Sequence, residues 1–374
     1  MRPRRRPDVL FERLADSSGL LVDPVSGSTH ALNASGVAIW ELCDGRRDPA
    51  AIARSMQERF DAPAGDIRAG VDALLGHLGE LHVLAQQPPR QPHVTHYDML
   101  GFRVRVESDS AEYLALLDRL NAFFRVPETR GDGEEPVGFY EVVAHDGGAL
   151  WELMFQGEEL VWHESLYKAV TATEFHMCET AIARRQDLVH VHSAALAAPG
   201  GSLLLPGTSG IGKTTFALAL ALRGKDRGLR LLSDDVVFLD PKTLRPECFP
   251  RQFHLHEDAL PLLAPLGLRY APDDVIGEHL CSTVLGEWDW SPGPPVRWVV
   301  FTQLQPNGKN AVEEMPKSEA AVQLMRFSKN LRRFPRGGLG VVPRLVEGAD
   351  CYRMTRNDNL AAAADMLIEL TAQG

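Results

Sequence analysis

Long hydrophobic runs are absent from this 374-residue sequence. No stretch approaches the roughly eighteen apolar residues that a membrane-spanning helix needs, so we expect neither a membrane span nor a membrane partner. Residues 1–7 are rich in arginine, but no apolar segment follows them, and a secretory signal is therefore not expected. A loose basic tail is the simpler interpretation of this start, and contact with an anionic partner is the alternative.

Cysteine and positive charge are both scarce. The five cysteines lie far apart with no C-x-x-C pair, which fits neither a disulfide framework nor a zinc site and predicts a protein of the reducing cytoplasm. There are 39 Lys and Arg residues against 50 Asp and Glu residues, a formal net charge of −11. This balance argues against a general nucleic-acid binder, but it does not exclude ATP, whose binding site is local.

The length predicts two or three domains. In residues 9–85, Gly19–Val22 and residues 28–32 read as a hairpin, and three helical patterns follow, starting at Asn33, Asp48 and Asp66. Residues 86–92 are polar and rich in proline, as linkers are. We therefore predict one domain over residues 1–88 and another over residues 95–374.

Residues 95–185 have a mixed pattern and form the predicted N-terminal subdomain of the second domain. We expect a strand at 102–106, a helix at 111–124, a loop at 131–136, a hairpin of 139–143 with Leu150–Phe155, and a helix at 169–185. None of this stretch carries a chemical motif. The nucleotide-binding core is predicted over residues 186–374.

A glycine-rich loop in this core fits G-x-x-x-x-G-K-[ST] at every fixed position. Its residues are Gly207, Thr208, Ser209, Gly210, Ile211, Gly212, Lys213 and Thr214, and Thr215 follows. A short apolar strand at 202–205 precedes the loop and a helical run at 214–222 follows it. We expect the loop amides and the helix N-terminus to bind the phosphates of ATP, with Lys213 at the β- and γ-phosphates and the Thr214 hydroxyl on Mg²⁺. A chance glycine turn is the alternative.

An apolar strand at 229–240 is interrupted by Ser233, Asp234 and Asp235. Adjacent acids within a strand are costly to bury without a cation or a proton between them. One aspartate is therefore expected to hold Mg²⁺ and the other to accept the proton of an attacking hydroxyl. The alternative is an acidic turn between two strands.

Two polar elements flank these motifs. His190 and His192 share one face of a predicted strand before the loop. The first interpretation is that both side chains pack in the structure, and a metal-binding pair is a weaker one. If one of the two has a polar role beside the phosphates, we favour His192. His254 and His256 repeat this spacing. Next to them we select Arg251 as a phosphate or substrate contact, against a solvated arginine.

The His-Ser-Ala-Ala stretch at 192–195, the glycine loop and the Leu-Leu-Ser-Asp-Asp strand at 231–235 together resemble the HPr kinase/phosphorylase family and its relatives. The resemblance covers residues 185–260 and, loosely, 95–370. It implies an α/β P-loop kinase fold related to phosphoenolpyruvate carboxykinase, which transfers phosphate to a serine of a protein or peptide. It implies that His192 is the family's histidine, that Lys213 and Thr214 bind phosphate and Mg²⁺, and that Asp234 or Asp235 is the general base.

The sequence departs from that family at three places. Thr215 stands where the HPr-directed enzymes usually have glutamate, and Thr208 stands where they have aspartate. No counterpart of their downstream glycine-rich loop is present, since residues 255–268 are quite different. We therefore do not expect phosphorylase activity, and neither HPr as substrate nor the family's hexamer follows from the resemblance.

Residues 9–85 are similar to PqqD-like domains, the peptide-recognition elements of systems that modify ribosomal peptides. The similarity rests on Leu32-Asn33, on Ile39 to Gly45 with its Cys-Asp-Gly turn, and on the three helices. It implies a small, winged-helix-like α+β domain that captures a leader peptide by strand addition. A winged-helix DNA reader has a similar element order, but residues 20–85 hold five basic and nine acidic side chains, which opposes DNA binding.

Together these features predict an ATP- and Mg²⁺-dependent kinase that phosphorylates a serine or another hydroxyl of a ribosomally made precursor peptide captured by the N-terminal domain. Binding of the leader would raise the local concentration of the acceptor. Two alternatives stay open: a nucleotide-switched peptide chaperone, and a small-molecule kinase with a regulatory N-terminal domain. The sequence does not decide whether copies of the chain form a homo-oligomer.

Overall fold

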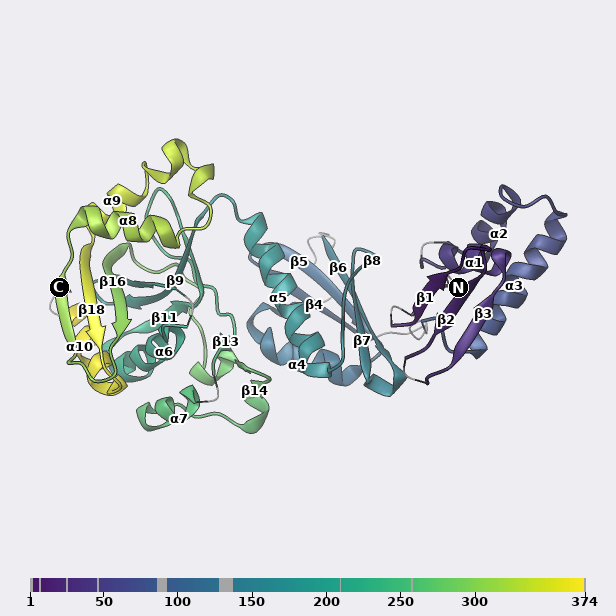
Figure 1. Cartoon of the computed structure of the whole chain (residues 1–374). Helices are drawn as coiled ribbons and strands as arrows, with labels where there is room; N and C mark the ends of the chain where they lie inside the picture. Colours follow the sequence, from purple (N-terminus) through teal and green to yellow (C-terminus); the bar gives the residue numbers. More distant parts are fainter. Residues whose placement is uncertain are drawn as a thin grey trace. The chain divides into compact units, whose positions relative to one another are not determined.

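The computed structural model describes residues 3–6, 8–24, 26–45, 47–85, 93–127, 137–208, 210–256 and 258–372 (Figure 1). The predicted linker at 86–92, the predicted loop at 131–136 and Ser209 lie outside the described residues. The chain divides into two compact units, Met1–Gln91 with His145–Gly147, and Pro92–Ala144 with Gly148–Gly374. Nowhere in the described ranges is a helix long and apolar enough to cross a membrane.

The first unit packs a small antiparallel sheet against helices. Its elements are β1 (Leu10–Arg13), β2 (Gly19–Val22), β3 (Thr29–Leu32), α1 (Ala34–Leu42), α2 (Pro49–Gln57) and α3 (Ala64–Glu80), with strand order β1-β2-β3. The predicted β2–β3 hairpin is confirmed. The strand β1 was not predicted, because its side chains are mostly exposed and show no alternation.

Side-chain caps start the first two helices of this unit, as the sequence predicts. Asn33 Oδ1 accepts a hydrogen bond from the Gly36 amide at 2.8 Å, and Asp48 Oδ1 accepts one from the Ala51 amide at 2.7 Å. Helix α3 begins at Ala64 rather than at Asp66, with Pro63 at its N-cap position. The buried side chains of the three helices form a core that includes Ile39, Ile52, Met56 and Val71.

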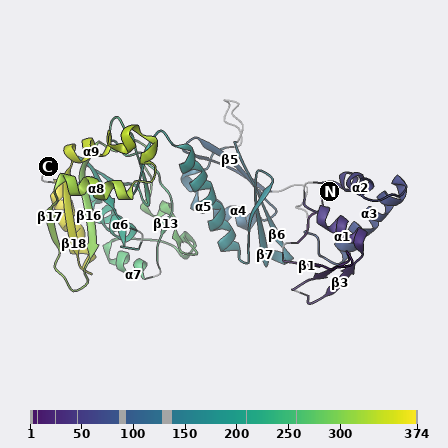
Figure 2. The same ribbon diagram turned by 45° about the horizontal axis from the view of Figure 1, so that its top comes forward.

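The second unit begins with a sheet in the order β4-β5-β6-β7-β8. Its elements are β4 (His93–Met99), β5 (Phe102–Ser108), α4 (Ala111–Leu120), β6 (Gly138–His145), β7 (Leu150–Phe155), β8 (Glu158–His163) and α5 (Leu166–Arg184). Helices α4 and α5 cover one face of the sheet, which both views show (Figures 1 and 2). The predicted strand at 102–106 and the helix at 169–185 are confirmed, although α5 begins earlier, at the Ser165 cap. The helix predicted to reach 124 ends at Leu120 and continues as a 3-10 turn.

A mixed sheet forms the rest of this unit, in the order β11-β9-β10-β16-β18-β17, with β12 also paired to β9. Its strands are β9 (Val189–Ala198), β10 (Gly201–Pro206), β11 (Arg230–Ser233), β12 (Val236–Leu239), β16 (Val296–Leu304), β17 (Ala311–Glu314) and β18 (Asp350–Arg356). The helices are α6 (Lys213–Gly224), α7 (Ala259–Leu263), α8 (Lys317–Phe327), α9 (Val342–Gly348) and α10 (Leu360–Ala372). The short strands β13 (Phe253–His254), β14 (Val275–Ile276) and β15 (His279–Leu280) form a separate small sheet.

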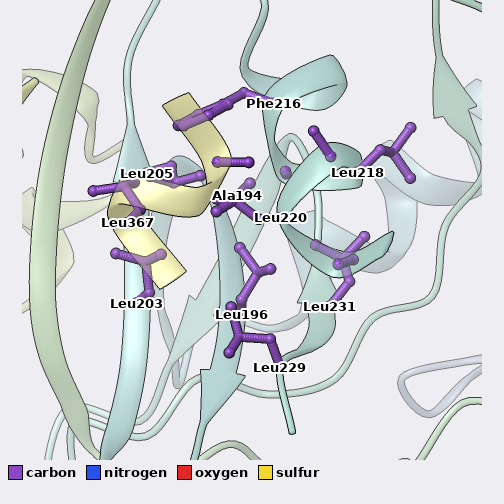
Figure 3. Close-up of a cluster of buried hydrophobic side chains, with 14 of the residues drawn as sticks. Ala194, Leu196, Leu203, Leu205, Phe216, Leu218, Leu220, Leu229, Leu231 and Leu367 are labelled. Atoms are coloured by element: carbon purple, nitrogen blue, oxygen red, sulfur yellow. The ribbon is translucent and has the colours of Figure 1, made fainter. Parts of the chain in front are cut away.

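Both faces of the mixed sheet are buried. Because strand side chains alternate, Leu203 and Leu205 of β10 pack in the core with α6 and α10, while Leu204 packs in the core with α8 and α9. Figure 3 shows the first of these cores, with Phe216 and Leu220 of α6 close to β9 and β10. This packing fixes the start of α6, and so the glycine loop that precedes it.

Candidate active site

The glycine loop joins β10 to α6, the predicted strand–loop–helix order. Gly210 and Gly212 have φ values of +81° and +78°, a conformation that L side chains rarely adopt. A Cβ on Gly212 would also lie 2.5 Å from Nη2 of Arg356 on β18. That same Nη2 donates a 2.6 Å hydrogen bond to the Ile211 carbonyl. The distant strand β18 thus stabilises the bend of the loop, and the positive φ of Gly212 favours glycine at this position.

Lys213, the first residue of α6, is buried with 7% of its surface exposed. Its Nζ donates to the Thr208 carbonyl at 2.8 Å and lies 3.1 Å from Nε2 of His192. Burial lowers the pKa of Lys213 below its usual value, while the charges of Asp234 and Asp235 oppose that shift. The ammonium group is therefore held in place, and its charge is available to an anion in the loop.

Thr214 and Asp234 are joined directly. The Thr214 hydroxyl donates a 2.7 Å hydrogen bond to Asp234 Oδ2, while Oδ1 of the same carboxylate is buried without a hydrogen-bond partner among the described residues. Burial raises the pKa of Asp234 to about 6. The negative charge of this buried carboxylate is not fully stabilised by its neighbours. A bound cation or a proton would stabilise it.

Asp235 occupies the turn between β11 and β12, with a φ of +66°. Both strands pair with β9, and this register places the Asp235 carboxylate beside His192, with Oδ1 3.1 Å from Nδ1 of the ring. The hydrogen bond from His192, assisted by the nearby charge of Arg251, lowers the pKa of Asp235 to about 2. Since a carboxylate accepts and an ammonium donates, His192 carries its proton on Nδ1 and accepts from Lys213 at Nε2.

Arg251 is held by two carboxylates. Its Nε donates to Glu174 of α5 at 3.1 Å and its Nη1 to Asp235 Oδ2 at 3.5 Å. Glu174 is fully buried. Burial by itself lowers the pKa of Arg251, but the charge of Glu174, with smaller contributions from its other neighbours, raises that pKa above its usual value. Arg251 was expected at the site from the sequence, but Glu174 was not. Glu174 could have been identified as an acidic residue at helical spacing between the apolar residues Val170 and Cys178.

A cavity of about 910 Å³ collects most of the predicted site residues. Those lining it are His192, Gly210, Ile211, Gly212, Lys213, Thr214, Thr215, Asp234, Asp235 and Arg251. Gly207 and Thr208 do not line the cavity. The Thr208 carbonyl oxygen instead accepts a hydrogen bond from Lys213. His190 does not line the cavity. Its Nε2 lies 2.7 Å from the Arg185 carbonyl oxygen, and its ring packs on Phe238.

His254 and His256 also line the cavity, together with His279 of β15. The His254 ring lies 5.1 Å from the ring of His279, and its Nε2 lies 2.8 Å from a carboxylate oxygen of Glu278. Within the described ranges no group of three or more His, Cys, Asp or Glu residues is arranged to hold a metal ion.

The first unit holds a cavity of about 530 Å³ of its own. It lies beside β3, which among the described residues has a strand neighbour only on its β2 side. Residues of β3, of the start of α1 and of α3 line it, among them His30, Leu32, Ile67 and Gly70. An open strand edge beside a helix is a geometry that binds extended peptides.

The solved structures that are similar to parts of this chain include the following three. A structure of TbiB1 in complex with the TbiA(beta) leader peptide is 17% identical and covers 23% of this chain and 99% of its own, with a TM-score of 0.21. A lasso peptide synthetase B1 complexed with the leader peptide is 22% identical over 23% of this chain and 100% of its own, with a TM-score of 0.21. The Hpr(Ser) kinase/phosphatase from Coxiella burnetii is 16% identical over 50% of this chain and 99% of its own, with a TM-score of 0.23.

No curated protein sequence matches the chain. A family model does match within the first unit, and it confirms the expected similarity of the N-terminal segment. Residues 19–84, which run from β2 through α3, match the family described as Coenzyme PQQ synthesis protein D (PqqD).

Proposed function

We propose that this chain is an ATP-dependent kinase that phosphorylates a serine or another hydroxyl of a ribosomally made precursor peptide, and that its PqqD-like unit binds the leader of that peptide. One observation carries the kinase proposal. Lys213, Thr214, Asp234 and Asp235 line a single cavity at the N-terminus of α6. A cation for phosphate, a hydroxyl and a carboxylate for a metal, and a second carboxylate for a proton are the parts that phosphoryl transfer needs.

ATP fits the loop because of its amides and charges. The left-handed conformations of Gly210 and Gly212 turn the backbone around the start of α6, where free N–H groups and the helix dipole favour anions. Lys213 adds a full positive charge. In this proposal Arg251 does not bind phosphate, because Glu174 and Asp235 already neutralise it; it positions Asp235 instead.

The donors beside the loop also fit Mg²⁺. The Thr214 hydroxyl and the Asp234 carboxylate are hard oxygen ligands 2.7 Å apart, and the second oxygen of Asp234 is buried without a partner among the described residues. Mg²⁺ commonly takes one or two protein oxygens and completes its shell with substrate phosphates and water. When bound, it would neutralise charge on the phosphate oxygens. We therefore assign Asp234 to the metal.

Asp235 is then the general base. The acceptor oxygen forms a bond to the γ-phosphorus, the bond from that phosphorus to the β–γ bridging oxygen breaks, ADP leaves, and the hydroxyl proton passes to Asp235. His192 and Arg251 hold the carboxylate in place and keep it ionised at neutral pH. Its low pKa makes it a weak base, so orientation of the hydroxyl would contribute more than basicity in a loose transition state.

Peptide capture is proposed for the cavity beside β3. A leader segment would add as a strand to the open edge and place alternate side chains against α3. Residues 20–85 do not favour nucleic acid, since their acidic side chains outnumber the basic ones. Covalent connection of the two units would raise the effective concentration of the acceptor, to about millimolar for short linkers.

Glycines on α3 provide a matched test in the full chain. A Cβ on Gly70 meets nothing within 4 Å, and Gly70 lines the peptide cavity; Gly76 is equally open but lies outside the lining. Phenylalanine at either position is a better helix residue than glycine, so both variants should fold. We expect Gly70→Phe to slow phosphorylation of the leader-bearing peptide and Gly76→Phe to leave it unchanged, in a mass-spectrometric time course using a peptide encoded beside the gene.

Wild type, Gly70→Phe and Gly76→Phe should all phosphorylate a leaderless peptide slowly and at the same rate. Wild-type rates with Gly70→Phe on the leader-bearing peptide would refute capture at this cavity. Nucleotide-dependent peptide release without any phosphopeptide would favour the chaperone alternative. Phosphorylation of free serine or another small alcohol, with no peptide modified, would favour the small-molecule kinase.

A further inference from the structure

The stretch of chain that joins α8 to α9 carries charge of one sign only (Figure 1). Between Glu319 and Glu347 there is no acidic residue, although the whole chain has a formal net charge of −11. We call residues 326–336 the basic segment; its cationic side chains, all exposed, are Arg326, Lys329, Arg332, Arg333 and Arg336. No ion pair or side-chain hydrogen bond joins any of them to another residue in the described part of the chain. Like charges without counter-charges repel one another, so an anion would stabilise this surface.

Backbone contacts hold the basic segment against β9, close to the proposed base. The Lys329 amide donates a 2.9 Å hydrogen bond to the His190 carbonyl, and Ser328 pairs with Val191 in an isolated antiparallel bridge. The side chain of Asn330, which is 9% exposed, accepts a 2.9 Å hydrogen bond from the His190 amide. The position of the segment on the edge of β9 is therefore fixed.

Lys329 lies on the face of β9 that carries His192. Because Ser328 pairs with Val191 in antiparallel fashion, the next residue, Lys329, stands opposite His190. Residues two apart on a strand share a face, and His192 contacts Asp235. The pKa of Asp235 is lowered first by the hydrogen bond from His192 and also by the charge of Lys329. The basic segment thus acts electrostatically on the proposed base.

The anion that fits this surface is a carboxylate of the acceptor rather than a phosphate of ATP. ATP bound at the glycine loop would occupy the cavity, whereas no residue of the basic segment lines that cavity. An acceptor must place its hydroxyl at Asp235, while its flanking residues extend beyond the cavity to the exposed cations beside it. Three of the four arginines follow Lys329 within seven positions, and arginine pairs with carboxylates through two parallel hydrogen bonds.

We propose that the basic segment binds acidic side chains that flank the acceptor hydroxyl, with Lys329, Arg332 and Arg333 pairing with carboxylates of the peptide. The inference rests on the proposed kinase function and names the chemistry of its substrate, a hydroxyl with Asp or Glu close to it in the sequence. A neutral peptide or a free alcohol gains nothing from this surface.

Two probes test this in the full chain: acetyl-Asp-Asp-Gly-Ser-Gly-Asp-Asp-amide, and a neutral probe with Asn in place of each Asp. An exposed ion pair changes affinity by up to about fivefold. With several pairs, wild type should phosphorylate the acidic probe with a KM about tenfold lower than the neutral one. Because salt screens exposed charges, 0.5 M NaCl should remove most of this preference, about half a molar being well above physiological ionic strength.

Charge-neutral variants locate the effect. Arg332→Gln/Arg333→Gln should raise the KM of the acidic probe about fivefold, close to that of the neutral probe. Lys225→Gln/Arg227→Gln is the matched control, because it removes two exposed positive charges just beyond the end of α6 opposite the glycine loop. The control should keep the wild-type preference. Both variants should unfold at the wild-type temperature, since the altered side chains are exposed.

Binding titrations with a nonhydrolysable Mg·ATP analogue separate this inference from the proposed function. Acid-selective binding that is lost in Arg332→Gln/Arg333→Gln but gives no phosphopeptide would refute the kinase and support the inference. Equal KM for the two probes, an acidic preference that survives in this variant or falls equally in the control, or no probe binding would overturn it. Binding of a duplex DNA oligonucleotide that depends on the two arginines, with no preference for the acidic probe, would overturn it in favour of a nucleic-acid surface.

Discussion

Replacing Asp234 by asparagine should stabilise the metal-free protein while removing its activity. The pKa of this carboxyl is raised from 3.8 to about 6 by burial. Because the folded chain binds the proton more tightly than the unfolded chain, ionisation of Asp234 costs stability. That cost begins near pH 4 and is complete above the folded pKa. Two pKa units correspond to about 3 kcal/mol.

Asparagine removes the charge and still offers an oxygen to the Thr214 hydroxyl, now 2.7 Å from Asp234 Oδ2. In chelator, Asp234→Asn should therefore exceed wild type in the free energy of unfolding by up to about 3 kcal/mol at pH 7.5 and match it near pH 4. Urea unfolding at the two pH values measures the difference. Saturating Mg·ATP should reverse the order, because ligand that binds only the folded wild type adds to its stability.

An Asp234→Asn protein that is less stable than wild type at pH 7.5 without metal would refute this reasoning. It would show that the carboxylate is well solvated or paired, and the assignment of Asp234 to the metal would lose its physical basis. Equal stability changes at pH 4 and pH 7.5 would point to lost packing or hydrogen bonding rather than to charge. Neither result would bear on Asp235, whose pKa is shifted in the opposite direction by His192 and Arg251.

Other predictions concern the same cavity. Lys213→Ala should abolish most of the Mg·ATP affinity measured by calorimetric titration, while the far-UV circular dichroism spectrum stays unchanged. Equal affinity in the two proteins would refute the assignment of the glycine loop as the nucleotide site. Asp235→Asn should leave Mg·ATP binding nearly intact and slow transfer by roughly 10² to 10⁴, and a loss below about tenfold would return the acidic turn to a structural role. Gly212→Ala should weaken Mg·ATP binding and lower the unfolding midpoint, because φ is +78° and a Cβ would lie 2.5 Å from Arg356; wild-type affinity would contradict the close approach. Excess inorganic phosphate should release no pyrophosphate from the phosphorylated product, and clear release would show that the missing glycine-rich loop is dispensable.

Features that depend on neighbours along the chain could be predicted from the amino-acid sequence. The glycine loop with its flanking strand and helix, the caps at Asn33 and Asp48, and the interruption of the apolar run 229–240 by polar residues all follow from local rules, because each requires only a few consecutive residues. Composition also indicated a small acidic N-terminal unit, and the PqqD match over 19–84 agrees with that segment. Strand β1 could not be predicted from the sequence, because its side chains are mostly exposed and show no alternation of apolar and polar residues.

The contacts of the polar residues, in contrast, join positions far apart in the sequence and form only when the chain folds. His192 meets the Asp235 carbonyl 43 positions away, Arg251 meets Glu174 77 positions away, and Arg356 meets Ile211 145 positions away. These pairings are set by the register of β11 and β12 on β9 and by the packing of α5 and β18, which no local pattern encodes. The same packing gave Asp234 and Asp235 opposite pKa shifts, since one carboxylate is buried beside a hydroxyl and the other lies between an imidazole and a guanidinium. Two adjacent aspartates that are indistinguishable in the sequence thereby became chemically different groups.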